Sequence, residues 1–275
     1  MHKTILITGA TDGIGFETAK MLAADGHHLL VHGRNPDKLR QAQAALSALS
    51  DDARIETFLA DLSHMPDVKA LAAAVTQKHT RLDVLINNAG VYTAADPRTD
   101  DGLDVRFAVN TYAPYLLTRL LLPLFGASGR VVNLSSAAQA PVDLQALAGK
   151  GQLGDGAAYA QSKLALTMWS RSLGLELSKT GPAIIAVNPG SMLGSKMVRQ
   201  AFGVAGGDLR IGADILVRAA FSEEFASATG TYFDNDSGAF AAPHPDALDP
   251  NKCAEIIRVI KAVLADLPNT NGEIQ

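Results

Sequence analysis

The sequence contains little cysteine, few aromatic residues and no long apolar run. One cysteine in 275 residues excludes an internal disulfide and is typical of proteins from a reducing compartment. The formal net charge is -4 and no basic block occurs, which argues against a nucleic-acid partner. No stretch reaches the about 20 apolar residues of a membrane span, and the apolar run before Gly9 is too short for a signal peptide. These absences predict a cytoplasmic protein without a membrane span.

The sequence does contain a regular alternation of short apolar runs and longer helical stretches. The apolar runs predict strands at residues 4–8, 29–32, 55–60, 84–87, 131–134, 184–187 and 231–233. The helical stretches lie at residues 13–24, 36–49, 67–79, 104–125, 157–179, 208–220 and 251–267. This alternation predicts an α/β fold with a single doubly wound, Rossmann-type parallel sheet and helices on both faces. Because no linker divides the chain, we expect one domain over residues 1–275, with a C-terminal extension over about residues 234–275.

A glycine-rich turn, TGATDGIG at residues 8–15, follows the first predicted strand. Glycines permit a tight turn and let the backbone approach a diphosphate, which a helix N-terminus stabilises through its N–H groups. The spacing G-x-x-x-G-x-G differs from the usual G-x-G-x-x-G, but its place between first strand and first helix favours nucleotide binding.

Arg34 follows the second predicted strand, where an acid would select NAD and an arginine fits the 2′-phosphate of NADP. The position favours NADP(H), with NAD(H) also possible; a solvated surface arginine is the alternative interpretation. After the fourth strand, Asn87, Asn88, Ala89 and Gly90 fit either an approach to a ribose or a bare turn.

Ser135 and Ser136 follow the fifth strand, and Tyr159 and Lys163 lie four residues apart on the next predicted helix. That spacing puts the phenol and the ammonium on one helix face. An unperturbed phenol titrates near pH 10, and a nearby cation lowers its pKa, which would give a usable general acid/base. A serine hydroxyl close by would stabilise negative charge on a substrate oxygen.

Taken together, the T-G-x-x-x-G-x-G turn, N-N-A-G, the serine and Y-x-x-x-K resemble the short-chain dehydrogenase/reductase family. The resemblance runs from Thr4 to about Phe233. VLINNAG, RVVNLSS, AYAQSKLA and GTYFDND are similar to the branch related to retinol dehydrogenases and the WW-domain oxidoreductase. This resemblance implies an NADP(H)-dependent oxidoreductase, either an alcohol dehydrogenase or a carbonyl reductase. It also implies a homodimer or homotetramer that forms through residues 104–125 and 157–179. The apolar faces of these helices are alternatively explained as covering the sheet.

The resemblance also implies a role for each matching residue. Tyr159 would be the general acid/base, Lys163 would lower its pKa and bind the nicotinamide ribose, Ser136 rather than Ser135 would hold the substrate oxygen, and Asn110 would complete a proton relay through water. Cofactor contacts are implied for Gly9, Thr11, Asp12, Gly13, Ile14, Gly15, Arg34, Asp61, Leu62, Asn88, Ala89, Gly90, Tyr159, Lys163, Pro189, Gly190 and Met192.

Two departures from the family pattern affect the segments around the site. Ser136 and Tyr159 are 23 residues apart, and the extra segment 141–156 is polar and glycine-containing, so we expect a surface excursion. The family pattern P-G-x-V-x-T corresponds to residues 189–195 of this sequence. The hydroxyl residue, Ser195, lies one position further along than in that pattern, so we do not count its contact with the cofactor. Five glycines between residues 191 and 212 indicate a flexible lid with an apolar inner face, and hence a small or lipophilic neutral substrate.

The remaining reactive side chains give weaker signals. The seven histidines lack an H-E-x-x-H spacing, so we expect no metal. Cys253 is expected to pack rather than react, and Trp169 to lie in the core or at a subunit interface. Two alternatives stay open: a related epimerase, dehydratase or enoyl reductase that uses the same cofactor, and a non-catalytic protein that senses NADP(H).

Overall fold

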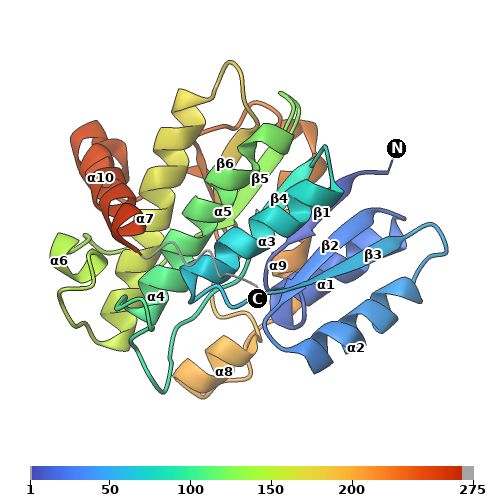
Figure 1. Cartoon of the computed structure of the whole chain (residues 1–275), viewed down its shortest axis with the longest axis horizontal. Helices are drawn as coiled ribbons and strands as arrows, with labels where there is room; N and C mark the ends of the chain where they lie inside the picture. Colours follow the sequence, from blue (N-terminus) through green and yellow to red (C-terminus); the bar gives the residue numbers. More distant parts are fainter. Residues whose placement is uncertain (1, 268–275) are drawn as a thin grey trace, which may run out of the picture.

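One eight-stranded sheet organises the molecule, with strand order β3-β2-β1-β4-β5-β6-β7-β8 (Figure 1). The computed structural model describes residues 2–267. The strands β1 to β7 run parallel to one another, and β8 is added beside β7 in antiparallel orientation. The strands are β1 (Thr4–Ile7), β2 (His28–Gly33), β3 (Arg54–Leu59), β4 (Val84–Asn87), β5 (Arg130–Leu134), β6 (Ala183–Asn188), β7 (Tyr232–Asp234) and β8 (Ala239–Ala241).

Helices cover both faces of this sheet (Figure 1). One face carries α1 (Gly13–Ala24), α2 (Pro36–Ser47) and α9 (Leu209–Phe221). The other carries α3 (Met65–Lys78), α5 (Ala113–Leu121) and α7 (Asp155–Glu176), with α10 (Pro250–Asp266) packed outside α7. Shorter helices are α4 (Val105–Phe107), α6 (Leu144–Leu147) and α8 (Lys196–Phe202), and 3-10 turns lie at Leu122–Leu124, Glu223–Phe225 and Pro245–Leu248. The α/β fold predicted from the sequence is confirmed; the antiparallel strand β8 was not foreseen.

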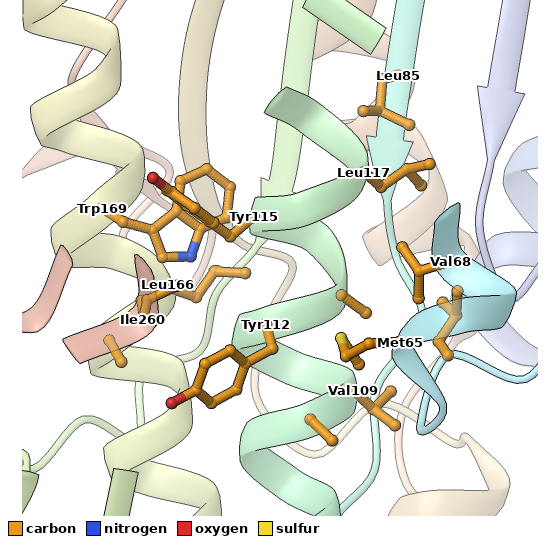
Figure 2. Close-up of a cluster of buried hydrophobic side chains, with 14 of the residues drawn as sticks. Met65, Val68, Leu85, Val109, Tyr112, Tyr115, Leu117, Leu166, Trp169 and Ile260 are labelled. Carbon is orange, nitrogen blue, oxygen red and sulfur yellow. The ribbon is translucent and has the colours of Figure 1, made fainter. Parts of the chain in front are cut away.

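Two apolar cores, one on each face, hold the helices to the sheet. Alternate residues of a strand point to opposite faces, so Leu30 of β2 joins the core under α3 while Leu29 and Val31 join the core under α1. Figure 2 shows the ring of Trp169 against that of Tyr115, between α7 and α5. Their centroids lie 5.5 Å apart at 80°, and Trp169 is fully buried. Trp169 is therefore a core residue.

The long helix predicted over residues 104–125 is interrupted. A π-helical turn, Ala108–Tyr112, separates α4 from α5, and the N–H of Ala113 bonds to the carbonyl of Ala108 five residues back. Pro114 explains the interruption, because it has no N–H to donate to the carbonyl of Asn110 and its ring disfavours a regular helix there. The widened turn thus contains Asn110, one of the predicted site residues.

The segment 141–156 is more ordered than expected. The segment 141–156 contains α6, capped by Asp143, and its Ala146 and Leu147 are buried. The hydroxyl of Tyr112 donates to the Leu147 carbonyl over 2.8 Å. The expectation of a surface excursion is therefore wrong for this part, because apolar side chains fold it back onto α10 and the π turn. Cys253 of α10 is buried, and burial raises the pKa of its thiol, in line with a packing role.

Within residues 2–267, no helix is long and apolar enough to span a membrane.

Candidate active site

The site lies where parallel strands end, on either side of the point at which the chain reverses its order along the sheet. β1 pairs with β2 on one side and with β4 on the other. In an open α/β sheet, the loops after such strands form the ligand crevice. The glycine-rich turn follows β1, the N-N-A-G segment completes and follows β4, and Ser136 follows β5.

The glycine-rich turn is held by the segment that follows β4. Gly9 has φ of +65°, and a Cβ there would lie 2.9 Å from the Cα of Ala89. At Gly15 a Cβ would meet the Asn88 side-chain nitrogen at 2.3 Å. That nitrogen donates to the carbonyls of Thr8 and Gly9, at 2.8 and 3.0 Å. Asn88 and Ala89 therefore shape the turn rather than only follow it.

Gly13 differs, because the space beside it is open. Its φ is +57°, and the nearest atom to a Cβ placed there is the Cβ of Ser195, 3.9 Å away. Gly13 begins α1, whose N-terminal N–H groups and dipole favour an anion. A backbone with open space at the start of a twelve-residue helix fits a diphosphate held by Gly13, Ile14 and Gly15.

Asp12 has a local structural role at this helix start. Its carboxylate accepts from the Gly13 N–H at 2.8 Å and from the Lys38 ammonium at 3.0 Å. Burial alone would raise the pKa of Asp12, but these two partners hold it below its ordinary value. Thr11 packs against Gly33, where a Cβ would lie 2.6 Å from the threonine methyl. Asp12 and Thr11 thus support the turn, and no side chain longer than glycine's fits at the end of β2.

His32, on β2, is a site residue that the sequence analysis missed. Its Nδ1 accepts from the Gly9 N–H at 3.2 Å and its Nε2 lies 3.1 Å from the Ala60 carbonyl. Burial lowers the pKa of His32 to about 4, so the ring is neutral at pH 7, with Nδ1 free to accept and Nε2 donating. One residue thereby joins the glycine-rich turn to the ends of β2 and β3. The signal in the sequence, a histidine closing an apolar strand, is too common to single it out.

Arg34 and Asp61 lie together beyond the ends of β2 and β3. Arg34 is exposed, and its charge contributes to lowering the pKa of Asp61. Burial opposes this shift, but hydrogen bonds from the Ser63 N–H and hydroxyl, at 2.9 and 2.7 Å, outweigh it. The side chain of Leu62 is buried in the core under α3, so only its backbone is available to a ligand. Lys38, which we had not selected, is a further cation on this side through its ion pair with Asp12.

Tyr159, Lys163 and Ser136 come together at the end of β5. Tyr159 and Lys163 are on α7, with the ammonium 5.7 Å from the phenol ring centroid. The Ser136 side chain is close enough to that of Tyr159 to lower its pKa, and the Ser136 hydroxyl accepts from the Ala138 N–H at 3.1 Å. Ser135 points away: it is buried, and its hydroxyl lies 2.6 Å from that of Thr167. The preference for Ser136 over Ser135 agrees with this geometry.

The charges around Tyr159 differ from the expectation. Burial raises the pKa of Tyr159, and the Ser136 side chain opposes this only in part. The Lys163 ammonium donates to the Leu134 carbonyl at 2.6 Å, and burial lowers its pKa to about 8. The lowered tyrosine pKa that we expected from Lys163 is therefore wrong for this structure. Burial shifts both groups toward their neutral forms, although a lysine pKa of about 8 still leaves Lys163 mostly protonated at pH 7.

Asn110 lies beside this group but acts on the backbone. Its side chain bonds both polar atoms of Val91, at 2.8 and 2.9 Å, and donates to the Ser162 hydroxyl at 2.9 Å. Ser162 in turn donates to the Tyr159 carbonyl at 2.7 Å. A Cβ at Gly90 would lie 3.5 Å from the Asn110 oxygen and 3.7 Å from the Lys163 nitrogen. Gly90 therefore leaves room for the two side chains to approach. Ser162, which we had not selected, links Asn110 to the backbone of Tyr159.

The segment after β6 closes over the site. Pro189 and Gly190 form the turn, with Gly190 at φ of +121°, and Met192 is the one non-glycine residue at positive φ within residues 2–267. The Met192 carbonyl accepts from the Gly207 N–H at 2.8 Å. Asp236, beyond β7, accepts from the Ser191 N–H and hydroxyl and from Asn188. These bonds fix the base of the segment.

Close packing, rather than the flexibility that we had expected, explains three of the five glycines of this segment, Gly194, Gly206 and Gly212. A Cβ at Gly206 would lie 2.6 Å from the Cα of Gly194, and the Gly194 N–H bonds the Gly207 carbonyl at 2.7 Å. At Gly212 a Cβ would lie 2.8 Å from Leu193. The absent side chains allow backbone segments to touch, so this part is tied down. Ser195 caps α8 through the Val198 N–H, which engages the hydroxyl whose cofactor contact was in doubt.

Aromatic and apolar side chains surround Tyr159 on its solvent side. The Tyr92 ring lies 4.8 Å from that of Tyr159 and 5.3 Å from that of Phe202 on α8. Phe202 is 49% exposed, and the Met197 methyl lies 3.6 Å from a Cβ placed on Gly90. The expected apolar inner face is therefore present, built from Tyr92 as well as from α8.

Comparisons with known proteins agree with this fold and site. A family model for short chain dehydrogenases matches residues 3–203. Retinol dehydrogenase 13 of Homo sapiens is 31% identical over 266 residues, covering 90% of this chain and 80% of that protein. Polyprenol dehydrogenase of Homo sapiens is 35% identical over 198 residues, covering 68% of this chain and 60% of that protein.

Two solved structures extend the likeness to three dimensions. An uncharacterized protein from Mycobacterium Paratuberculosis has a TM-score of 0.79 at 25% identity, covering 97% of this chain and 95% of that one. A short chain dehydrogenase from Burkholderia cenocepacia J2315 in complex with NADP has a TM-score of 0.68 at 25% identity, covering 85% and 95%. The fold and the site define an oxidoreductase. The chain belongs to the short-chain dehydrogenase/reductase family, and its relatives place it in the retinol dehydrogenase-like branch.

Proposed function

We propose that the protein interconverts an alcohol and a carbonyl compound by hydride transfer, with NADP(H) as the preferred cofactor. The observation that carries this proposal is the grouping of Ser136, Tyr159 and Lys163 at the strand ends that also bear the glycine-rich turn. Structural relatives described as bound to NADP support the choice of cofactor. The whole described chain, including the region after residue 234, is proposed to act as one domain.

The cofactor supplies or accepts a hydride at its nicotinamide ring. For carbonyl reduction, the Tyr159 phenol donates its proton to the substrate oxygen, since its raised pKa keeps it protonated at neutral pH. Ser136 donates a second hydrogen bond to the same oxygen and stabilises the charge that develops there. For alcohol oxidation, Tyr159 must first lose its own proton, and its phenolate oxygen then accepts the proton of the alcohol; the raised pKa favours this direction only at higher pH.

Lys163 and Asn110 are proposed to carry the proton between Tyr159 and solvent, toward Tyr159 in reduction and away from it in oxidation. The Lys163 nitrogen lies near the tyrosine ring, and a pKa of about 8 lets it exchange a proton close to neutral pH. In a regular helix the backbone carbonyl of Asn110 would accept from the N–H of residue 114, but that residue is proline and has none. The carbonyl is therefore suited to hold a water molecule. The side-chain bonds of Asn110 to Val91 and Ser162 fix that carbonyl in place.

Arg34 is proposed to select NADP(H) by binding the 2′-phosphate. Arg34→Ala should weaken NADPH binding roughly 10- to 100-fold, because a hydrogen bond to a charged group contributes about 1.5–3 kcal/mol. NADH binding should change little, since that cofactor has no 2′-phosphate. Titration of both cofactors by fluorescence measures the four affinities.

The matched control for this prediction is Arg40→Ala, in the second turn of α2, where the guanidinium pairs with Asp37. Equal losses for NADPH in both variants would reduce the effect to general surface charge. A loss in Arg34→Ala that is as large for NADH as for NADPH would contradict binding of the 2′-phosphate.

The substrate is proposed to be lipophilic and uncharged. Tyr92, Met197 and Phe202 present carbon atoms beside Tyr159, and the related human proteins are described as retinol and polyprenol dehydrogenases. A panel of aliphatic, terpenoid and aromatic alcohols and aldehydes, followed at the nicotinamide absorbance, tests this. Turnover of polyanionic substrates only would contradict it, and turnover without net redox change would favour an epimerase.

A homodimer or homotetramer stays a prediction. We had expected the second subunit to pack directly on α7. Because α10 packs on the outer side of α7, a second subunit on this side would contact α10 instead. Light scattering coupled to gel filtration gives the oligomeric state directly. The cytoplasmic location likewise stays a prediction.

A further inference from the structure

Three potential metal ligands from separate segments converge at the edge of the sheet opposite the active site. His28 is the first residue of β2, Glu56 lies on β3, and His79 follows the last residue of α3. One ligand atom from each lies within 4.8 Å of the other two. We propose that these residues bind one divalent transition-metal ion, with Zn²⁺ as the best-fitting chemistry.

The local backbone explains why the three side chains meet. In the parallel pairing of β2 with β3, Leu30 is opposite Glu56 and His28 is opposite Arg54, so His28 and Glu56 are diagonal neighbours on one face. That face is the one under α3, because Leu30 and Phe58 belong to the same core as α3. The end of α3 then brings the His79 ring against that of His28, at 5.3 Å between centroids.

The distances suit a tetrahedral ion. His28 Nε2 lies 2.9 Å from Glu56 Oε1, and His79 Nε2 lies 3.6 Å from Glu56 Oε2. Zn²⁺ binds imidazole nitrogen and carboxylate oxygen at about 2.0–2.2 Å, which separates neighbouring ligands of a tetrahedron by roughly 3.3–3.5 Å. The two observed separations are to different oxygens of Glu56 and lie on either side of this value. Because one ligand atom from each residue lies within 4.8 Å of the other two, the three side chains would draw together around a bound ion. Two imidazoles and one carboxylate leave the fourth position to water.

A second, independent feature points into the same space. The Nε2 of His79 is buried and has no hydrogen-bond partner within the described residues. Its side chain is only 10% exposed, and those of His28 and Glu56 only 16%. A buried polar nitrogen without a partner costs free energy. A metal ion bound at Nε2 would satisfy it, whereas the Glu56 carboxylate at 3.6 Å is too far for a hydrogen bond.

Two cations now share the carboxylate that the ion would use. Arg54 lies 3.1 Å from Glu56 Oε1, and Lys78 lies 3.9 Å from Oε2. Their side chains are 72% and 60% exposed, so both can turn into solvent when an ion binds. They compete with the metal, which predicts that removing Arg54 strengthens metal binding. A cluster that only pairs charges within the protein would show no such gain.

The position of the site indicates its role. It lies at the amino ends of β2 and β3, whereas the catalytic residues follow the carboxyl ends of β4 and β5. A bound ion would tie the end of α3 to two strands and stabilise the fold, since it binds only the folded chain. No metal was expected from the sequence because closely spaced ligands were the criterion. His28, Glu56 and His79 are 28 and 23 residues apart.

The test is calorimetric titration of the EDTA-treated, dialysed full chain with ZnCl₂. We expect one ion per chain, and a thermal midpoint raised by roughly 5–10 °C at a free Zn²⁺ concentration 100 times the Kd. His79→Ala and Glu56→Gln should each weaken binding on the order of tenfold or more. His64→Gln removes a histidine at the other end of α3 and should leave binding unchanged, while Arg54→Ala should strengthen it.

Several results would overturn the proposal. No binding by the wild type is one, and equal binding by wild type, His79→Ala and Glu56→Gln is another. If a ligand variant fails to fold by circular dichroism, Co²⁺ titration of the wild type decides instead. Intense visible absorption bands typical of tetrahedral Co²⁺ that disappear on adding Zn²⁺ support the site, and a spectrum of hydrated Co²⁺ only refutes it.

Discussion

Replacing Tyr159 with phenylalanine should lower kcat by roughly 10²–10⁴-fold, the usual contribution of a positioned general acid/base. Only one oxygen is removed, so the ring stays against Tyr92 and Lys163. The affinity for NADPH should be nearly unchanged, because the glycine-rich turn, His32 and Arg34 are left intact. Steady-state kinetics with a turned-over alcohol or aldehyde, together with NADPH titration, gives both quantities.

Tyr115→Phe is the matched control, since it removes the same atom from a ring packed on Trp169 in the core. It should keep kcat close to that of the wild type. If Tyr159→Phe retains most of its activity, the proposed chemistry at Tyr159 is wrong. If it loses NADPH affinity in proportion to kcat, Tyr159 holds the cofactor rather than the proton.

The placement of these residues could be predicted because it depends on topology alone. In a parallel sheet all strands end on the same side, so Gly9, Asn88 and Ser136 had to meet once the strands were identified. The spacing of Tyr159 and Lys163 placed them on one helix face in the same way. Local backbone rules sufficed for these residues, and no knowledge of packing was needed.

The features that escaped prediction depend on contacts between distant segments. His32 supports the turn only because Gly9 and Ala60 lie on either side of its ring. The same applies to Gly194 and Gly206: glycine indicates either flexibility or close approach, and only the fold shows that two backbones touch there. Likewise, α6 owes its burial to α10, which begins about 100 residues later.

The charge state of the catalytic pair escaped prediction for a similar reason. Spacing suggested that the Lys163 cation would lower the pKa of Tyr159. Burial acts on both groups and shifts both toward neutrality, raising the pKa of the phenol and lowering that of the amine to about 8. Burying a lysine that is mostly protonated at neutral pH lowers the free energy of unfolding, and this loss of stability can be measured.

Lys163→Met should therefore make the protein more stable at pH 7 while lowering kcat by roughly 10²-fold or more. The pKa of Lys163 is about 8 in the folded chain, against an ordinary value of 10.5. Holding the side chain protonated below pH 8 thus costs about 3 kcal/mol. Methionine avoids this cost but leaves the Leu134 carbonyl without its donor, a loss of about 1–2 kcal/mol. We expect a net gain of about 1–2 kcal/mol in the free energy of unfolding.

The sign of this effect should change with pH. Between pH 8 and 10.5 the unfolded chain binds more protons at Lys163 than the folded chain does, so the wild type gains stability as the pH rises. The variant has no such group, and its advantage should disappear near pH 10, leaving only the lost hydrogen bond. Urea unfolding at pH 7 and pH 10, without added cofactor, measures both differences, with Lys179→Met as the exposed control. A variant less stable than the wild type at pH 7, or a difference independent of pH, would contradict the free-energy cost of a buried, protonated lysine beside Tyr159.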